Sequence, residues 1–178
     1  MGVHDSRSVG PLALIVMGVS GSGKSTLGAA LAGALDCPFL EGDEFHSSEA
    51  VSRMRAGIPL TDEDRWPWLD RLGRAIAAAV GERGIAIASC SALKRAYRDR
   101  LRAVIAAPVR FILLDASREE LQRRMSSRKG HYMPPSLLDS QLATLERPEA
   151  DEHAITVDAL ASTAAACEQI LAALRGAH

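Results

Sequence analysis

The sequence predicts an α/β fold in which a parallel five-stranded sheet is covered by helices on both faces. Two observations predict this fold class. Short runs that are apolar on both faces, typical of strands buried between two layers, alternate along the chain with helical patterns. A glycine-rich turn follows the first of these runs and leads into a helix. With 178 residues, 47% of them hydrophobic, the chain is expected to form a single domain over residues 1–178.

Five strands are expected, each followed by a helical pattern. The strands are the apolar runs at residues 12–17, 37–41, 84–89, 109–114 and 154–157. The helices are expected at residues 26–35, 47–57, 64–82, 94–105, from Ser117 onward, 134–146 and 162–174. In the longest of them, four apolar residues share one stripe: Leu69, Leu72, Ile76 and Val80. Residues 1–10 are polar, and we expect them to be a flexible N-terminus.

Local signals mark several helix ends. Gly57 closes the second helix, and Ser47 or Ser48 can cap its start. Ser117 starts the helix after the fourth strand, and Glu120, three residues later, is placed to complete a capping box. These signals are consistent with a chain that alternates strand and helix throughout.

Composition narrows the class of protein. The formal net charge of −1 predicts neither a general nucleic-acid-binding surface nor a membrane-binding one. The cysteines are few, odd in number and scattered, which indicates a reducing compartment: Cys37, Cys90 and Cys167. Residues 1–6 fit the loose N-myristoylation pattern, which we interpret as chance. No signal peptide or membrane-spanning run is expected, and we predict a cytoplasmic location.

The most informative stretch is 18–25, which has the spacing of a P-loop, G-x-x-x-x-G-K-[ST]. The glycines let backbone N–H groups turn toward a phosphate, and the following helix adds the positive end of its dipole. Lys24 is expected to contact the β- and γ-phosphates, and Ser25 to bind Mg²⁺. The alternative is a glycine-rich turn with a chance lysine. The expected nucleotide-binding residues are Gly18, Ser20, Gly21, Ser22, Gly23, Lys24, Ser25 and Thr26.

Two carboxylates follow the second strand. Glu41 and Asp43 lie two residues apart, on one side of an extended chain. Such a pair can serve Mg²⁺ and a substrate hydroxyl, because ligands in open α/β sheets bind beyond the carboxyl ends of the strands. The alternative is an acidic turn that caps the next helix.

Arg65 stands at the start of the third helix, where a positive charge opposes the helix dipole. Pro67 lacks an N–H and fits a helix only in its first turn, so we expect this helix to begin near Asp64. Capping explains the acidic residues there but not Arg65. Arg65 is therefore a candidate ligand for an anion.

Basic residues also follow the third strand. Ser91 is placed to cap the next helix, and Lys94 and Arg98 share one face of it at a spacing of four. Like charges at this spacing repel each other, so a bound anion is one interpretation and a solvated basic face is the other. Arg65, Lys94 and Arg98 have no obvious local partners.

After the fourth strand, residues 124–135 are basic and contain helix-breaking glycine and proline residues. We predict a lid in which Arg124 and Arg128 share a helical face and clamp the transferring phosphoryl group. The alternative is an exposed basic loop.

Together these stretches resemble the small P-loop gluconokinases over about residues 12–158. The P-loop alone is generic, whereas Pro59-Leu60-Thr61-Asp62 and Cys90-Ser91-Ala92-Leu93-Lys94 are specific to that family. Other matching stretches are Gly42-Asp43 with His46, Asp64-Arg65-x-Pro67-Trp68-Leu69, Tyr97-Arg98-Asp99, Arg128-Lys129-Gly130-His131 and Leu137-Leu138-x-Ser140-Gln141.

The resemblance implies transfer of the ATP γ-phosphate to the 6-hydroxyl of D-gluconate with Mg²⁺, a nucleoside-monophosphate-kinase-like fold with a closing lid, and often a homodimer. It implies catalytic roles for Lys24, Asp43, Arg124 and Arg128. It also implies gluconate binding by Asp43, His46, Arg65, Ser91, Lys94, Arg98, His131 and Gln141, and metal binding by Ser25 and Glu41. The family usually has an aspartate at the position of Glu41, which leaves the metal role there open.

Two rival functions are consistent with parts of the pattern. One is a related small-molecule kinase such as shikimate kinase, which screening of acceptor acids separates. The other is a nucleotide-binding switch without turnover. A second set of cations away from the P-loop speaks against the switch, because a switch does not need them.

Overall fold

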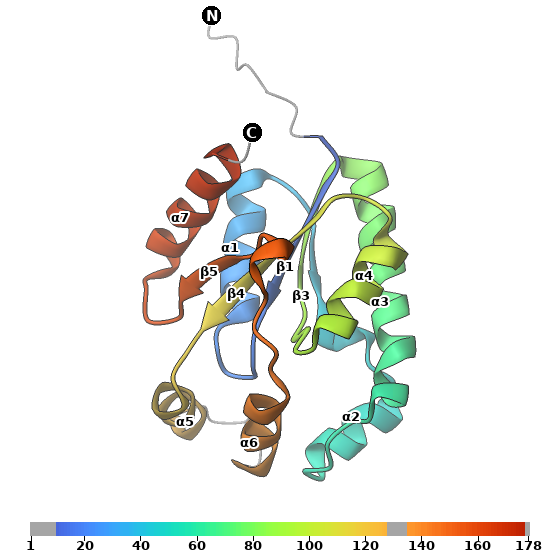
Figure 1. The fold of residues 1–178 in the computed structure, drawn as a ribbon, viewed down its shortest axis with the longest axis vertical. Coiled ribbons are helices and arrows are strands. Elements are labelled where there is room, and N and C mark those ends of the chain that lie inside the picture. The colour runs from blue at the N-terminus through green and yellow to red at the C-terminus, as the bar shows by residue number, and fades with distance from the viewer. Residues whose placement is uncertain (1–9, 128–134, 177–178) are drawn as a thin grey trace, which may run out of the picture.

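The sheet has the predicted architecture. The computed structural model describes residues 10–127 and 135–176. Its strands are β1 (Leu12–Met17), β2 (Phe39–Glu41), β3 (Ile85–Ser89), β4 (Val109–Asp115) and β5 (Ile155–Asp158). They form a five-stranded sheet in the order β2-β3-β1-β4-β5, and every neighbouring pair is parallel (Figure 1). The predicted parallel five-stranded sheet is confirmed.

The helices lie where the sequence places them, within about two residues. They are α1 (Lys24–Leu35), α2 (Ser48–Arg55), α3 (Asp62–Arg83), α4 (Arg95–Ile105), α5 (Arg118–Ser127), α6 (Pro135–Thr144) and α7 (Thr163–Gly176). Two short 3₁₀ turns, which the pattern did not predict, are η1 (Gly42–Phe45) and η2 (Ala150–Glu152). Within the described residues, no helix is long and apolar enough to cross a membrane.

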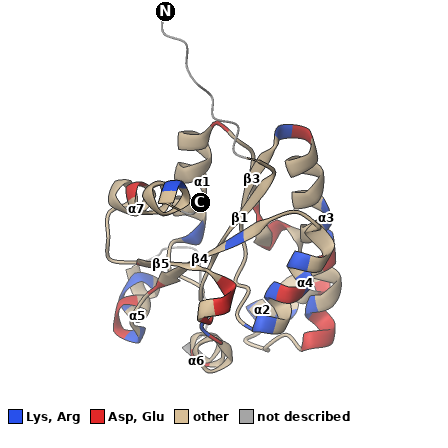
Figure 2. Ribbon diagram, turned by 45° about the horizontal axis from the view of Figure 1, so that its top comes forward, with Lys and Arg blue, Asp and Glu red and all other residues tan. Residues whose placement is uncertain are grey.

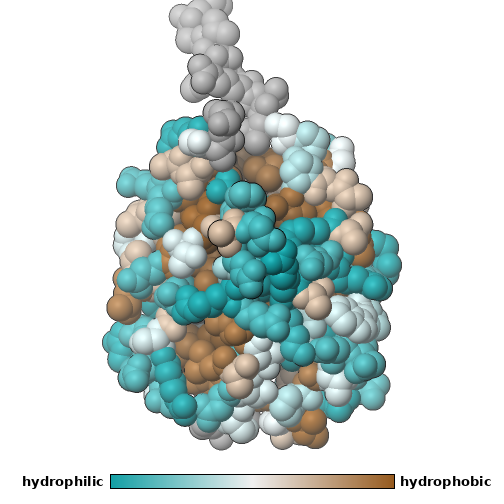
Figure 3. Space-filling model, in the orientation of Figure 1, coloured by the Kyte–Doolittle hydropathy of each residue, from teal (hydrophilic) through white to brown (hydrophobic). Residues whose placement is uncertain are grey.

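Two helical layers explain why the central strand is apolar at every position. Ala13, Ile15 and Met17 of β1 point into a core formed with α3 and α4, whereas Leu14 and Val16 point into a second core formed with α1 and α7. All five side chains are fully buried. A strand whose two faces are both buried has no water-exposed position for a polar side chain. The outer surface, by contrast, is largely hydrophilic, with hydrophobic residues in smaller patches (Figure 3).

The long helix α3 begins at Asp62, two residues earlier than predicted. Thr61 is its N-cap, and Thr61 and Asp64 form a capping box in which each side chain accepts from the other's backbone N–H. Pro67 therefore lies inside the helix rather than in its first turn. The capping box fixes the start of the helix at Thr61, and the helix continues through Pro67 although Pro67 cannot donate a backbone hydrogen bond.

The carboxyl edge of the sheet gathers the predicted functional stretches. The register pairs Ser89 of β3 with Val16 of β1 and with Glu41 of β2, so the turns after these three strands leave the sheet at one level. Helices α2, α5 and α6 lie beyond this same edge (Figure 1). A third, small apolar cluster joins the turn after β1 to α5 and α6: Val19, Leu93, Leu121 and Leu138.

Candidate active site

The P-loop turn depends on glycine at positions where the backbone is left-handed. Gly21 has φ +83° and Gly23, the N-cap of α1, has φ +99°. A Cβ on Gly18 would also lie 3.0 Å from the carbonyl oxygen of Leu114. The Lys24 Nζ donates to the Val19 carbonyl at 3.1 Å, which folds the lysine back over the loop. The turn is therefore shaped to direct backbone N–H groups toward an anion at the start of α1.

Side-chain hydroxyl groups also lie at this turn. Ser25 and Thr26 are exposed in the first turn of α1, whereas Ser22 is buried. Within the described residues, the Ser22 Oγ has no hydrogen-bond partner. A buried hydroxyl without a partner costs free energy, so this atom is a candidate contact for a ligand. Mg²⁺ prefers oxygen ligands, and the Ser25 hydroxyl and the Glu41 carboxylate are ligands of this kind. Their chemistry therefore fits the predicted metal role.

Helices α5 and α6 are tied to the P-loop by side chains. The Gln141 Oε1 accepts from the Ser20 backbone N–H at 2.7 Å, and its Nε2 donates to the Ser20 Oγ at 3.1 Å. The Arg124 guanidinium donates to the carbonyl oxygens of Ser22 at 3.0 Å and Ala159 at 2.6 Å, and to Glu120 at 2.8 Å. Gln141, predicted to bind the substrate, therefore contacts the nucleotide-binding turn in this structure.

Glu120 differs from its expected role. The Ser117 Oγ accepts from the Glu120 backbone N–H at 3.2 Å, as an N-cap does. The Glu120 carboxylate pairs with Arg123 and Arg124, however, at 2.8 Å each. These two guanidiniums lower the pKa of Glu120 through their hydrogen bonds.

The two carboxylates at the end of β2 and just after it are held differently. The Ser89 hydroxyl donates to Glu41 and accepts from the Gly42 N–H at 3.1 Å, which orients Glu41 at the end of β2. Gly42 fits only because it lacks a side chain, since a Cβ there would lie 2.0 Å from the Ser89 carbonyl oxygen. Asp43 follows in η1. Glu41 therefore lies next to the end of β3.

Asp43 has the raised pKa expected of a proton acceptor. Its side chain is exposed, yet surrounding protein desolvates it, and this desolvation raises its pKa. The positive charge of Lys24 lowers the pKa and the negative charge of Glu41 raises it. The structure thus brings Lys24, Glu41 and Asp43, predicted from separate stretches, within electrostatic reach of one another.

His46 is a neutral group in this site. Its ring stacks on Trp68 with 4.0 Å between the centroids. Burial, followed by the charges of Arg65 and Arg71, lowers the pKa of His46 to about 4. The Nδ1 of His46 is buried without a hydrogen-bond partner among the described residues. At neutral pH this imidazole can therefore offer a hydrogen bond but not a charge.

An open pocket of about 330 Å³ lies between α3, α4 and α6. Arg65 lies at its wall with its guanidinium carbon 5.2 Å from the centre of the Tyr97 ring. Its Nη2 donates to the Leu60 carbonyl at 3.4 Å, and its Nε is buried without a partner within the described part of the chain. The lining residues are Pro59, Leu60, Thr61, Asp62, Glu63, Arg65, Lys94, Tyr97, Ser140 and Thr144. Arg65 thus has the unused donor that an anion can accept from.

Lys94 reaches the same pocket, but the expectation that it has no local partner is wrong. Its Nζ lies 3.1 Å from the Asp62 Oδ1, and the Tyr97 hydroxyl donates to the same oxygen. Hydrogen bonds from Tyr97 and Lys94 lower the pKa of Asp62. Burial and then Asp62 raise the pKa of Tyr97. Asp62 and Tyr97 were not predicted to be site residues, because the contacts of Asp62 with Lys94 and Tyr97 join stretches that are distant in the sequence.

The predicted cap of α4 is also wrong. The N-cap is Lys94 rather than Ser91, and Lys94 makes no side-chain capping bond. The Glu146 carboxylate accepts from the Arg95 N–H at 2.9 Å and supplies the missing cap. Ser91 instead contributes its carbonyl oxygen, which accepts from the Gly18 N–H of the P-loop at 3.2 Å.

Arg98 does not lie in the pocket. Its side chain is fully buried and forms a two-pronged ion pair with Glu152, with distances of 2.7 and 3.0 Å. The prediction that Arg98 lacks a partner and binds the substrate is wrong, because Glu152, 54 residues away, already pairs with it. Of the lid residues, Arg128 and His131 lie outside the described residues, and their predicted roles are not tested.

A second pocket, of about 290 Å³, lies against the P-loop. Ser22, Gly23 and Thr26 line it together with Arg124 and the turn between β5 and α7. The contributing residues of that turn are Asp158, Ala159, Ala161 and Thr163. No motif marks this turn, so the sequence did not predict it.

Comparison with known proteins shows the family to which the chain belongs. A family described as an AAA domain matches residues 14–148. The chain is 43% identical to the thermosensitive gluconokinase of Escherichia coli (strain K12) over 166 residues, which cover 90% of this chain and 88% of the relative. It is 48% identical to the gluconokinase of Gluconobacter oxydans (strain 621H) over 151 residues, covering 83% of this chain and 82% of the relative.

Comparison with solved structures supports the same family. A gluconokinase from Sinorhizobium meliloti 1021, 46% identical, superposes with a TM-score of 0.83 and covers 93% of both chains. A shikimate kinase from Aquifex aeolicus vf5, 16% identical with a TM-score of 0.56 over 92% of this chain and 96% of that one, shares the fold alone. On the identity and coverage of these relatives, the chain belongs to the gluconokinase family of P-loop kinases.

Proposed function

We propose that this protein is an ATP-dependent gluconokinase that transfers the γ-phosphoryl group of ATP to the 6-hydroxyl of D-gluconate. The observation that carries the proposal is that Arg65, which lines the pocket together with Lys94, lies within electrostatic reach of Cys90, as do Lys24 of the P-loop and Asp43. A kinase for an anionic acceptor needs a phosphate-binding turn, a proton acceptor and cations for the acceptor. These residues supply all three, and the gluconokinase relatives support the choice of acceptor.

Each residue has a role in the transfer. Lys24 and the P-loop N–H groups neutralise charge on the β- and γ-phosphates, and Arg124, which already contacts the Ser22 carbonyl, adds positive charge nearby. Asp43 orients the acceptor hydroxyl and accepts its proton, consistent with its raised pKa. Arg65 and Lys94 bind the carboxylate end of gluconate, and His46 offers a neutral hydrogen bond.

Ser25 and Glu41 would hold Mg²⁺, which supplies positive charge between the phosphates when it is bound. The second pocket, lined by Thr26 and the turn before α7, is proposed to receive the nucleoside part of ATP. Arg128 retains its predicted role in the lid and His131 its predicted role in binding gluconate, and a homodimer in the cytoplasm is part of the proposal.

The proposal is tested by measuring ADP release across a panel of acceptors that includes D-gluconate, other sugar acids and shikimate. Turnover highest with gluconate supports a gluconokinase. Turnover highest with shikimate would assign the related kinase, and no turnover with any acceptor would favour a nucleotide-binding switch.

A further inference from the structure

The loop between β3 and α4, residues 90–94, joins the two halves of the proposed site. The carbonyl oxygen of Ser91 accepts from the Gly18 N–H of the P-loop at 3.2 Å. Three residues further on, Lys94 reaches the acceptor pocket. The conformation of this loop therefore sets the position of the acceptor cation relative to the phosphate-binding turn.

The loop does not adopt a relaxed backbone conformation. Ala92 has φ +46°, in the left-handed region that residues with a Cβ rarely adopt. Strained residues of this kind persist where the surrounding structure holds them in place. A specific contact must therefore fix the loop at Ala92.

Arg98 supplies that contact. Its Nη1 donates to the carbonyl oxygens of Ala92 at 2.9 Å and Leu93 at 3.3 Å. The Leu93 carbonyl also accepts from the Glu146 N–H at 2.7 Å. One guanidinium thus holds two successive carbonyl groups immediately before Lys94, while its other edge binds Glu152.

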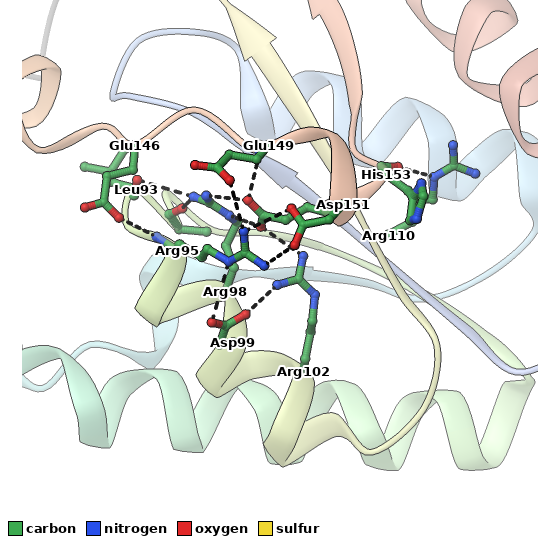
Figure 4. Close-up of polar contacts among 12 residues, drawn as sticks. Leu93, Arg95, Arg98, Asp99, Arg102, Arg110, Glu146, Glu149, Asp151 and His153 are labelled. Carbon is green, nitrogen blue, oxygen red and sulfur yellow. Dashed lines mark hydrogen bonds and ion pairs between the residues drawn. The ribbon is translucent and has the colours of Figure 1, made fainter.

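Glu152 holds the guanidinium in place from the other side. Its side chain is only 1% exposed, and Arg102 donates to it as well, at 3.0 Å. Hydrogen bonds from Arg98, and then from Arg102 and the Glu149 N–H, outweigh desolvation and lower the pKa of Glu152 to about 2. Figure 4 shows this arrangement, in which arginines of α4 converge on acidic residues of the segment between α6 and β5. Basic and acidic residues also lie close together on α4 in Figure 2.

We propose that Arg98 and Glu152 are positioning residues for phosphoryl transfer, which act by fixing the loop that carries Ser91 and Lys94. Neither is available to the substrate, because both side chains are buried. A lysine cannot replace the arginine, since an ammonium lacks the planar fork that binds a carboxylate on one edge and two carbonyls on the other. The expected kinetic effect rests on the proposed function, whereas the expected change in the conformation of the loop does not.

The test compares Arg98→Lys and Glu152→Gln with the wild type and with a matched control, Arg100→Lys. Arg100 lies on the same helix and forms a similar two-pronged pair with Asp70, at 2.7 and 2.8 Å, but among the described residues it donates no hydrogen bond to the loop. All measurements are made well below each variant's melting temperature, so that only folded protein is compared. Glu152→Gln keeps the shape of the side chain and serves if Arg98→Lys fails to fold.

Amide hydrogen exchange is the first measurement. The amides of Gly18 and Glu146 should exchange at least about tenfold faster in Arg98→Lys and Glu152→Gln, because their acceptors lie in the loop. The amide of Ala13, bonded to Pro108 outside the loop, should change only as far as the global stability of the variant changes, and it serves as the internal reference for global unfolding. Arg100→Lys should exchange like the wild type at all three amides.

Steady-state kinetics is the second measurement. The KM for gluconate should rise about tenfold or more, because Lys94 is misplaced. The KM for ATP should change little, because Gln141 and Arg124 also anchor the P-loop. A folded variant with wild-type exchange at Gly18 and Glu146, or with a wild-type KM for gluconate, would overturn the positioning role, even if its melting temperature fell. If the wild type itself does not phosphorylate gluconate, the proposed function fails, and the exchange data alone decide whether the pair positions the loop.

Discussion

Lys94 and Asp62 form an ion pair at the wall of the acceptor pocket, with 3.1 Å between the Lys94 Nζ and the Asp62 Oδ1. Lys94 is therefore partly neutralised before any acceptor arrives. Arg65, by contrast, has a buried Nε without a partner among the described residues. The two cations should contribute unequally to acceptor binding.

The unequal contribution can be measured with Arg65→Met and Lys94→Met. We expect Arg65→Met to raise the KM for gluconate by roughly 10- to 100-fold, the range of a hydrogen bond to a charged group, and Lys94→Met to raise it less. Arg74→Met, on the same helix and exposed outside the pocket, is the control and should leave KM unchanged. A larger effect for Lys94→Met would show that the Asp62 pair does not weaken Lys94.

Replacing Lys24 by alanine tests the nucleotide site. Turnover should fall by roughly 10²-fold or more, because the β- and γ-phosphates lose their point charge in the transition state. The melting temperature should change little, because this partly exposed lysine at the start of α1 adds little to packing. Turnover and thermal unfolding are measured on the same preparation, and near-normal turnover would refute the role.

Replacing Asp43 by asparagine separates proton transfer from binding. The value of kcat should fall by roughly 10²- to 10⁴-fold, because the amide keeps the size of the side chain but cannot accept a proton. The KM for gluconate should change much less, since an interaction made mainly in the transition state lowers kcat and kcat/KM together.

Glu41→Gln provides the contrast to Asp43→Asn. If Glu41 serves the metal, raising the Mg²⁺ concentration should restore the activity of Glu41→Gln but not that of Asp43→Asn. Steady-state kinetics of both variants across a Mg²⁺ titration makes the comparison. Rescue of Asp43→Asn by Mg²⁺ would reassign Asp43 to metal binding.

The lowered pKa of His46 predicts a dependence of stability on pH. The pKa is about 4 in the folded protein and near 6.5 when unfolded, so between these values the unfolded chain binds more protons. The free energy of unfolding should therefore fall as the pH is lowered from about 6.5 to 4, by on the order of 2 kcal/mol.

His46→Phe keeps an aromatic ring for stacking on Trp68 and removes the titrating group. Chemical denaturation at several pH values should give a flatter profile between about 4 and 6.5 for this variant than for the wild type. Parallel profiles for the two proteins would mean that the environment of His46 does not depress its pKa.

The strands, the helices and the P-loop could be predicted because their signals are local. Gly21, Gly23 and Lys24 are neighbours in the sequence, and their spacing alone indicates a phosphate-binding turn. Pairs made by the fold could not be predicted in this way. Lys94 pairs with Asp62 across 32 residues, Arg98 pairs with Glu152 across 54, and Gln141 meets Ser20 across 121.

The Arg98 error has a definite physical cause. From the sequence alone, Lys94 and Arg98 look like two equivalent cations one turn apart on a helix. In the structure the helix begins only after Lys94, so Lys94 extends toward the pocket while Arg98 points into the protein. The carboxylate that decides its role stands in the 3₁₀ turn η2, which no local signal predicted.

Initial rates of ADP formation with D-gluconate and with D-glucose test the assignment of an anionic acceptor most directly. The two molecules are similar in size, but only gluconate carries a charge, and a site built around Arg65 and Lys94 leaves its cations unpaired when glucose binds. The value of kcat/KM should be larger for gluconate by roughly 10²-fold or more. Comparable values for the two acceptors would contradict the assignment of this protein as a gluconokinase.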